Sequence, residues 1–251
     1  MRLLYAEALK VRTAPRTLLG LVLALVALDV LGAGSTASGG GPDFVPNADE
    51  IVTFDVITVA TTGVIFAMIL GILIVTWEYR HGTITQTFLA TPRRERVMAA
   101  KYAVGFGTGA ILTALSVAVV LVTALFWISP VLHREQWELI GRLVFASALW
   151  GIFGAGLGAV IQSQVGAIVT VFVWFLVAEP LIGVQFDHFA DYLPGAVIDR
   201  LTGHEASAAA EGAEETTQHS FGLWTAGLLA VGYALGAGVL GAASAVWRDI
   251  S

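Results

Sequence analysis

Few residues of this chain have the types and spacing that chemistry requires, and the most conspicuous pair stands inside an apolar run. Glu179 and Pro180 interrupt residues 165–182, which are otherwise mostly apolar. A carboxylate in apolar surroundings is costly, so it marks a candidate functional site. Pro180 also breaks the helix and could admit water, which gives the pair a structural interpretation as well. Asp29, near the end of an earlier apolar run, favours the structural interpretation more strongly.

Catalytic groups of other kinds are missing from the sequence. The chain has no cysteine, which excludes disulfides, thiolate nucleophiles and cysteine-based metal sites. Its five histidines fall between the apolar runs, so none is placed to act with a serine or aspartate inside a helix, as an intramembrane protease would require. No Gly-x-x-x-x-Gly-Lys-Ser/Thr phosphate loop occurs. We therefore predict no catalytic residue and no metal site.

A polar segment at residues 78–94 separates two apolar runs. Gly82 permits a sharp turn there, and Thr83 can cap a following short helix that Pro92 cannot extend far. The segment is predicted to hold a short helix parallel to a membrane, with a compact contact face. An ordinary loop that obeys the positive-inside rule would explain its charges equally well. The residues assigned to the contact are Glu78, Tyr79, Arg80, Gly82, Thr83, Ile84, Thr87, Phe88, Pro92 and Arg94.

Composition indicates the elements that must position these residues. Hydrophobic residues make up 57% of the 251 and charged residues 13%, and the mean hydropathy is +0.80. Soluble domains carry about 25% charged residues, so the excess apolar surface is expected to face lipid. Runs long enough to cross about 30 Å of hydrocarbon as helices predict a single all-α transmembrane domain, residues 1–251, with six spans at about 17–33, 55–77, 102–128, 143–162, 165–182 and 223–247.

Charge distribution orients these spans, because Lys and Arg gather on the cytoplasmic side of membranes. Of the 13 Lys and Arg residues, ten fall on one predicted side: Arg2, Lys10, Arg12, Arg16, Arg80, Arg93, Arg94, Arg96, Lys101 and Arg248. The other three are Arg134, Arg142 and Arg200, and that side also holds most of the acids. Both termini and the 77–101 segment are therefore predicted to be cytoplasmic.

Three further segments lie outside the spans. Residues 1–16 are predicted to form an interfacial helix with Leu4, Tyr5 and Val11 on its apolar face. The Gly/Ser run 32–41 is predicted to be a flexible external loop. Residues 184–201 are too apolar for a free loop and too short to span, so an external re-entrant element between spans five and six is predicted, followed by an acidic stretch at 203–218.

The motif Glu78-Tyr79-Arg80-x-Gly82-Thr83, followed by Pro92-x-Arg94 and Lys101, resembles the permease subunits of ABC-2-type ABC transporters, as does the six-span topology. In that family, the segment between the second and third spans carries a coupling helix that docks into a groove of the ATPase subunit. The resemblance covers nearly the whole chain, except for the long first external loop and the acidic 203–218 stretch.

The resemblance implies that this chain is not an enzyme by itself and binds no cofactor. ATP and Mg²⁺ would bind a separate cytoplasmic ABC ATPase subunit, present in two copies, and a second permease chain, identical or related, would complete the pathway. The implied function is export of a small hydrophobic or amphipathic compound, such as a drug-like molecule or lipid, across the cytoplasmic membrane of a bacterium. Nothing implies a nucleic-acid partner. Glu179 and Pro180 are then candidates for an external gate or substrate path.

Glycines recur four residues apart within the predicted spans, where they would share one helix face. We expect these pairs to pack helices together, either within the chain or at a dimer seam: Gly105 and Gly109, Gly154 and Gly158, and Gly232 and Gly236. Two other functions remain as alternatives to a permease. One is a membrane-embedded enzyme, which would need convergent polar groups, and the other is a channel or non-transporting membrane anchor.

Overall fold

The computed structural model describes residues 2–12, 15–39, 48–90, 93–130, 132–203 and 222–247, and every regular element in these ranges is a helix. Pro92 and residues 204–221 therefore lie outside the described part of the chain, as does the side chain of Phe88. The predicted acidic stretch falls almost wholly in that undescribed range.

Six helical segments are long and apolar enough to cross a membrane, which confirms the predicted number of spans and is what a multi-pass membrane protein requires. They are Arg16–Ser38, Thr53–Arg80, Arg94–Ala124, Arg134–Ile161, Gln164–Gln185 and Leu223–Ala245. The helices that form them are α2 (Pro15–Gly39), α3 (Ala48–Val59) with α4 (Thr62–Arg80), α6 (Arg94–Ala124), α7 (Arg134–Ile161), α8 (Gln164–Val173) with its continuation, and α13 (Leu223–Trp247).

Helices α6 and α7 begin earlier than the spans predicted at 102–128 and 143–162. Two other spans differ from the prediction in kind. Helix α2 continues to Gly39, through most of the run predicted as a flexible loop. Within it, the Ser35 and Ser38 hydroxyls donate to backbone carbonyls three residues earlier, so these polar groups are satisfied by the helix itself. The second span is two helices, because the chain turns at Ala60 and Thr61 between α3 and α4.

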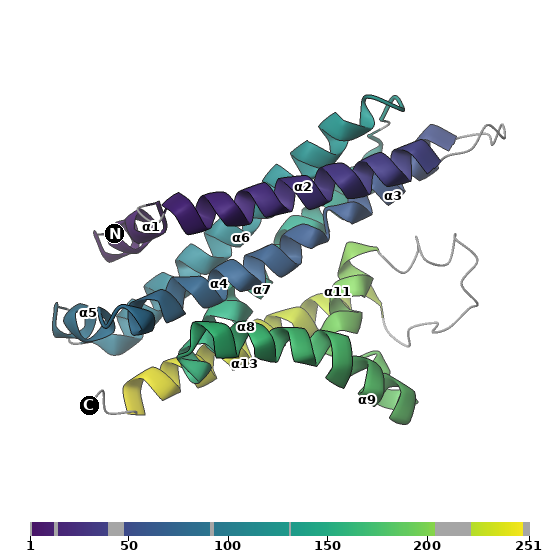
Figure 1. Cartoon of the computed structure of the whole chain (residues 1–251). Coiled ribbons are helices and arrows are strands. Elements are labelled where there is room, and N and C mark those ends of the chain that lie inside the picture. The colour runs from purple at the N-terminus through teal and green to yellow at the C-terminus, as the bar shows by residue number, and fades with distance from the viewer. Residues whose placement is uncertain are drawn as a thin grey trace.

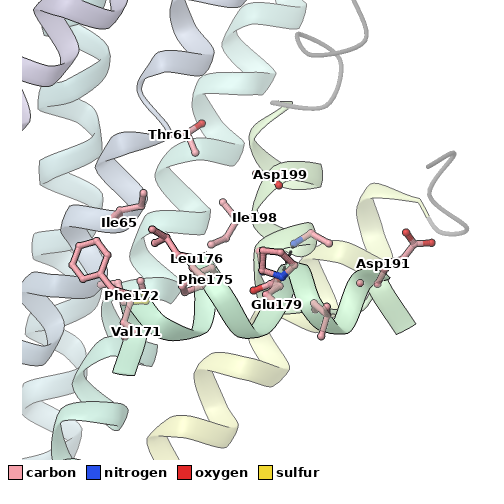
Figure 2. Close-up of a pocket in the computed structure, with 17 residues that line it drawn as sticks. Thr61, Ile65, Val171, Phe172, Phe175, Leu176, Glu179, Asp191, Ile198 and Asp199 are labelled. Carbon is pink, nitrogen blue, oxygen red and sulfur yellow. Dashed lines mark hydrogen bonds between the residues drawn. The ribbon is translucent and has the colours of Figure 1, made fainter. Parts of the chain in front are cut away.

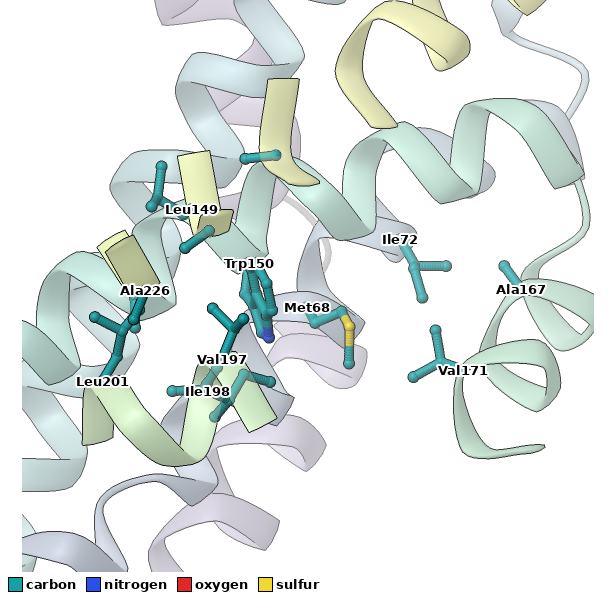
Figure 3. Close-up of a cluster of buried hydrophobic side chains, with 14 residues drawn as sticks. Met68, Ile72, Leu149, Trp150, Ala167, Val171, Val197, Ile198, Leu201 and Ala226 are labelled. Atoms are coloured by element: carbon teal, nitrogen blue, oxygen red, sulfur yellow. The ribbon is translucent and has the colours of Figure 1, made fainter. Parts of the chain in front are cut away.

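Helix α7 lies at the centre of the bundle, packed against α4, α6 and α13. Small residues allow these helices to approach closely. A Cβ added at Gly154 would lie 2.1 Å from the Met68 backbone oxygen, and one added at Gly151 would lie 2.3 Å from that of Gly105. The largest buried cluster surrounds Trp150 of α7, with Met68 of α4 and Val197 and Ile198 of α11 (Pro194–Thr202) beside it (Figure 3).

The bundle has two chemically different ends (Figure 1). Helix α1 (Arg2–Arg12), the short helix α5 (Ile84–Ala90) and the last turns of α13 gather at one of them, which we call the α5 end. Towards the opposite, α11 end, the fifth span continues from α8 through a π-helical turn η1 (Trp174–Ala178) into α9 (Glu179–Gln185). Helices α10 (Asp187–Ala190) and α11 follow before the chain reaches α13.

Candidate functional site

The α4–α5 junction owes its shape to one glycine. Gly82 has φ +64°, a left-handed conformation that favours glycine. Its N–H donates to the Tyr79 carbonyl, and the Thr83 N–H donates to the Glu78 carbonyl at 3.0 Å. These two bonds satisfy the last carbonyls of α4 in the Schellman arrangement. The chain thereby turns sharply from α4 into α5, as the sequence predicted for Gly82.

Beneath this junction, four side chains form a closed ring of ion pairs from three helices. The Lys10 ammonium lies 2.6 Å from both the Glu7 and the Glu78 carboxylates, and the Lys101 ammonium lies 2.8 Å from both. Lys101 is 0% exposed and Glu7 1%. Two acids and two bases balance in charge, which is the condition under which buried ions are tolerated. The ring fastens α1 to α4 and α6.

Lys10 is the one member of the ring that reaches solvent, with 44% of its side chain exposed. Burial lowers the pKa of Lys10, but the hydrogen bonds and negative charges of Glu7 and Glu78 outweigh this and raise it above its ordinary value of 10.5. Lys10 is therefore a firmly charged member of the ring at neutral pH.

Sequence reasoning found Glu78 and Lys101 but did not place Glu7 or Lys10 with them. The predicted apolar face of α1 is largely the exposed one, with Leu4 47% and Tyr5 71% exposed. Glu7, at the edge of that face beside Val11, is instead the buried one among the described side chains of α1. The available signal was the single acid of α1, Glu7, three residues before the base Lys10, since residues at this spacing share one helix face.

Tyr79 and Arg80 reach a different neighbour, the turn between α7 and α8. The Gln162 side-chain amide donates to the Tyr79 hydroxyl at 3.5 Å, and the Arg80 guanidinium donates to the Gln164 side-chain oxygen at 3.1 Å. Three consecutive residues at the end of α4 are thus bound to α1, α6 and the α7–α8 turn. Arg94, at the start of α6, donates to the Ala245 carbonyl of α13 at 3.2 Å.

Helix α5 presents a different face from the predicted one. Ile84 is 3% exposed and packs with Val75, Val97 and Met98, so it anchors α5 and cannot be a surface contact as predicted. The exposed side of α5 carries Leu89, which is 78% exposed, with Thr85 and Gln86. Thr87 is half-buried, and its hydroxyl donates to the Thr83 carbonyl at 3.2 Å.

At the α11 end, Glu179 ties the fifth span to α11. One of its carboxylate oxygens accepts the backbone N–H groups of Gly195 at 2.5 Å and Ala196 at 3.3 Å. These are the first free donors of α11, so the carboxylate caps that helix and interacts favourably with its dipole. Pro180 stands at the start of α9 with a largely exposed side chain.

A cavity of about 490 Å³ opens beside Glu179 (Figure 2). Its walls come from three places: the first turns of α4 with Thr61, the stretch from α8 to α9, and the segment from α10 to α11. Apolar and aromatic side chains dominate the lining, and its charged members among the described side chains are Glu179, Asp191 and Asp199. This volume is typical of sites for small organic molecules.

Asp29 lies elsewhere, between α2 and α4. It is 0% exposed, and one carboxylate oxygen accepts a hydrogen bond from the Thr62 hydroxyl at 2.5 Å. It lines no part of the cavity described above. Asp29 is placed to join two spans, in keeping with the structural interpretation.

The predicted glycine pairs divide into two groups. A Cβ added at Gly105, Gly109, Gly154 or Gly158 would lie 3.0 Å or less from a backbone oxygen of a neighbouring helix. These glycines lie in tight helix contacts within the chain. An added Cβ at Gly232 or Gly236 would meet nothing within 4 Å, so this pair does not pack helices within the chain and faces outward instead.

Chemically, the α5 end is suited to docking and the α11 end to binding an organic molecule. Among the residues that the structure describes, no three His, Cys, Asp or Glu residues are grouped so as to hold a metal ion. No protein-family model matches the sequence, and no curated protein shows a significant match to it.

Proposed function

We propose that this chain is the permease subunit of an ATP-driven transporter of the ABC-2 type. In this proposal it exports a small hydrophobic or amphipathic compound, and a separate ATPase subunit that docks on α5 supplies the energy. The proposal is supported by the six apolar spans and by the position of α5 between the second and third of them.

The main support for this proposal is the set of contacts that Glu78, Tyr79 and Arg80 make with neighbouring segments. A docking helix that receives force from a partner must be rigidly joined to the spans it moves. Glu78 joins the end of α4 to α1 and α6 through the ion ring, and Tyr79 and Arg80 join it to the turn between α7 and α8. An ordinary connecting loop would need none of these bonds.

The partner would contact the exposed side of α5, with Leu89 as its apolar centre. An exposed leucine beside polar Thr85 and Gln86 suits a groove that has an apolar floor and a polar rim. Ile84 has the complementary role of fixing α5 to the bundle from within.

The remaining topology follows from the same proposal. The α5 end would be cytoplasmic, with α1 lying in the interface and both termini on that side. Helices α10 and α11 would form the external re-entrant element. A second permease chain would cover apolar surface that one chain leaves open, and the outward Gly232 and Gly236 of α13 are available for such a contact.

The test is capture of an ATPase by the full-length tagged chain from its native membranes in mild detergent. ATP hydrolysis in the eluate is measured for wild type, for Leu89→Asp and for a matched control, Phe126→Asp. Phe126 is 80% exposed and follows α6 at the opposite end of the bundle. We expect Leu89→Asp to remove the captured ATPase activity and Phe126→Asp to retain it.

Wild-type chain that captures no ATPase, or Leu89→Asp chain that captures as much as wild type, would contradict the proposed docking site. Size-exclusion elution at the wild-type volume shows that each variant is folded, so a loss of capture can be assigned to the surface of α5.

A further inference from the structure

The side chains that line the cavity beside Glu179 favour a positively charged ligand. Three carboxylate-bearing residues line it, Glu179, Asp191 and Asp199, and no Lys, Arg or His does among the side chains that the structure describes. In surroundings of low dielectric constant, carboxylates favour a positively charged guest over a negatively charged one.

Glu179 is held in place by the backbone of α11. One oxygen is occupied by the Gly195 and Ala196 N–H groups. The other oxygen is buried and accepts no well-formed hydrogen bond from the residues that the structure describes, although the Trp174 indole is within interaction range. A buried carboxylate with spare accepting capacity is a natural partner for a cation.

The apolar part of the lining suits an organic cation rather than a metal ion. Phe172 and Phe175 line the cavity together with Ile65 and Leu176 (Figure 2). Aromatic faces attract bulky organic cations. A cavity walled mostly by carbon lacks the six or so oxygen ligands that a hard metal cation requires.

The π-helical turn η1 brings these side chains onto one wall. The lining residues Val171, Phe175, Glu179 and Gly183 recur at intervals of four. In a regular α-helix, each interval of four overshoots a full turn by about 40°, so such a series would drift off the face. The wider turn at Trp174–Ala178 offsets part of that drift. The helix irregularity therefore keeps aromatic rings and carboxylate on the same cavity wall.

We propose that this cavity binds a lipophilic organic cation, with Glu179 as its counter-charge and Phe172 and Phe175 as its aromatic contacts. That the bound cation is the transported cargo rests on the proposed transport function. Binding itself can be measured on the purified chain alone.

Binding of tetraphenylphosphonium to the full chain in lipid nanodiscs tests this, with empty nanodiscs as background. Tetraphenylborate has nearly the same size and shape but the opposite charge. We expect saturable binding of the cation and none of the anion. Glu179→Gln retains an oxygen that can cap α11 but loses the charge, so the affinity for the cation should fall about tenfold or more.

The matched control is Glu135→Gln, which removes an exposed carboxylate at the start of α7, outside the cavity. It should bind the cation like wild type. Phe172→Ala removes a largely exposed ring of the lining with little cost to folding and should weaken cation binding several-fold. This variant keeps the test decisive if Glu179→Gln does not fold.

The proposal is overturned by equal binding of cation and anion, by absence of saturable cation binding, or by folded variants that bind like wild type. Failure of the permease proposal would give a different result, in which the chain binds the cation but captures no ATPase. The reverse result, ATPase capture without cation binding, would leave the permease proposal standing and reject the cation site.

Discussion

The Lys101 ammonium lies 2.8 Å from the Glu7 carboxylate, and neither side chain is more than 1% exposed. The two residues are 94 positions apart in the chain. Their contact makes α1 an integral part of the bundle, whereas a helix held only by lipid would be free to leave it.

Lys101→Met is expected to lower stability strongly, because it leaves two buried carboxylates with a single base. Removing one partner of a buried pair costs about 3–5 kcal/mol. The matched control is Arg134→Met, since Arg134 forms its ion pair with Glu138 on the surface, where its side chain is 89% exposed. Thermal unfolding in detergent measures both, and midpoints lowered by similar amounts would contradict a stabilising ring.

We expect the stability that Lys10 contributes to be lost at alkaline pH, and comparison of wild type with Lys10→Met measures this contribution. Because the pKa of folded Lys10 is raised above 10.5, its stabilising effect is fully present below that value and is lost as pH rises through the folded pKa. The unfolding midpoint of wild type should exceed that of Lys10→Met at neutral pH, and the difference should shrink only as pH rises beyond 10.5. A difference that stays constant across this range would exclude charge on Lys10 as its cause.

Gly154→Ala is expected to destabilise the bundle by about 1–3 kcal/mol, because the added methyl group would overlap the Met68 backbone. Gly232→Ala provides the control: its methyl group meets nothing within the chain, and alanine favours a helix by about 1 kcal/mol over glycine. Chemical unfolding of both purified variants measures the contrast. If Gly232→Ala lost stability and Gly154→Ala did not, the expected contrast would be contradicted, and Gly232 would lie in a tight contact with a second copy of the chain.

Arg80→Met is expected to impair coupling more than folding. Its bond to Gln164 is exposed, and exposed polar contacts contribute about 1 kcal/mol or less. The unfolding midpoint should therefore remain near that of wild type. Stimulation of the captured ATPase by cargo should fall, because α5 would lose one link to the α7–α8 turn. Normal stimulation in this variant would mean that force passes to the spans by another route.

Sequence predicted the spans well because the requirement for about 20 apolar residues is local and strong. It also located the turn at Gly82, because a left-handed residue directly after a helix end is a position where glycine is strongly favoured. The prediction failed for Ile84, whose burial depends on Val97 and Met98 of the next span folding back over it. Helical periodicity alone does not say which face of a two-turn helix meets the bundle.

The ion ring and the cavity depend on contacts between distant parts of the chain. Nothing near Glu7 in the sequence indicates that Lys101 will lie beside it. Glu179 stood out as a costly acid, but its cap on Gly195 requires α11 to return across the end of the fifth span. Glu179 also shares a cavity wall with Val171 and Phe175, and sequence reasoning identified neither that wall nor the π-helical turn within it.

The ring has a mechanical consequence for the whole chain. Its four charges balance only when all are present, so separating α1 from α4 and α6 would leave the buried Glu7 or Lys101 without its counter-charge. We therefore expect this end of the molecule to move as a rigid body. The fifth span, which contains the π-helical turn, has by contrast only 17% of its apolar stretch buried within the chain. The contacts of the chain itself therefore constrain that edge of the bundle far less than they constrain the α5 end.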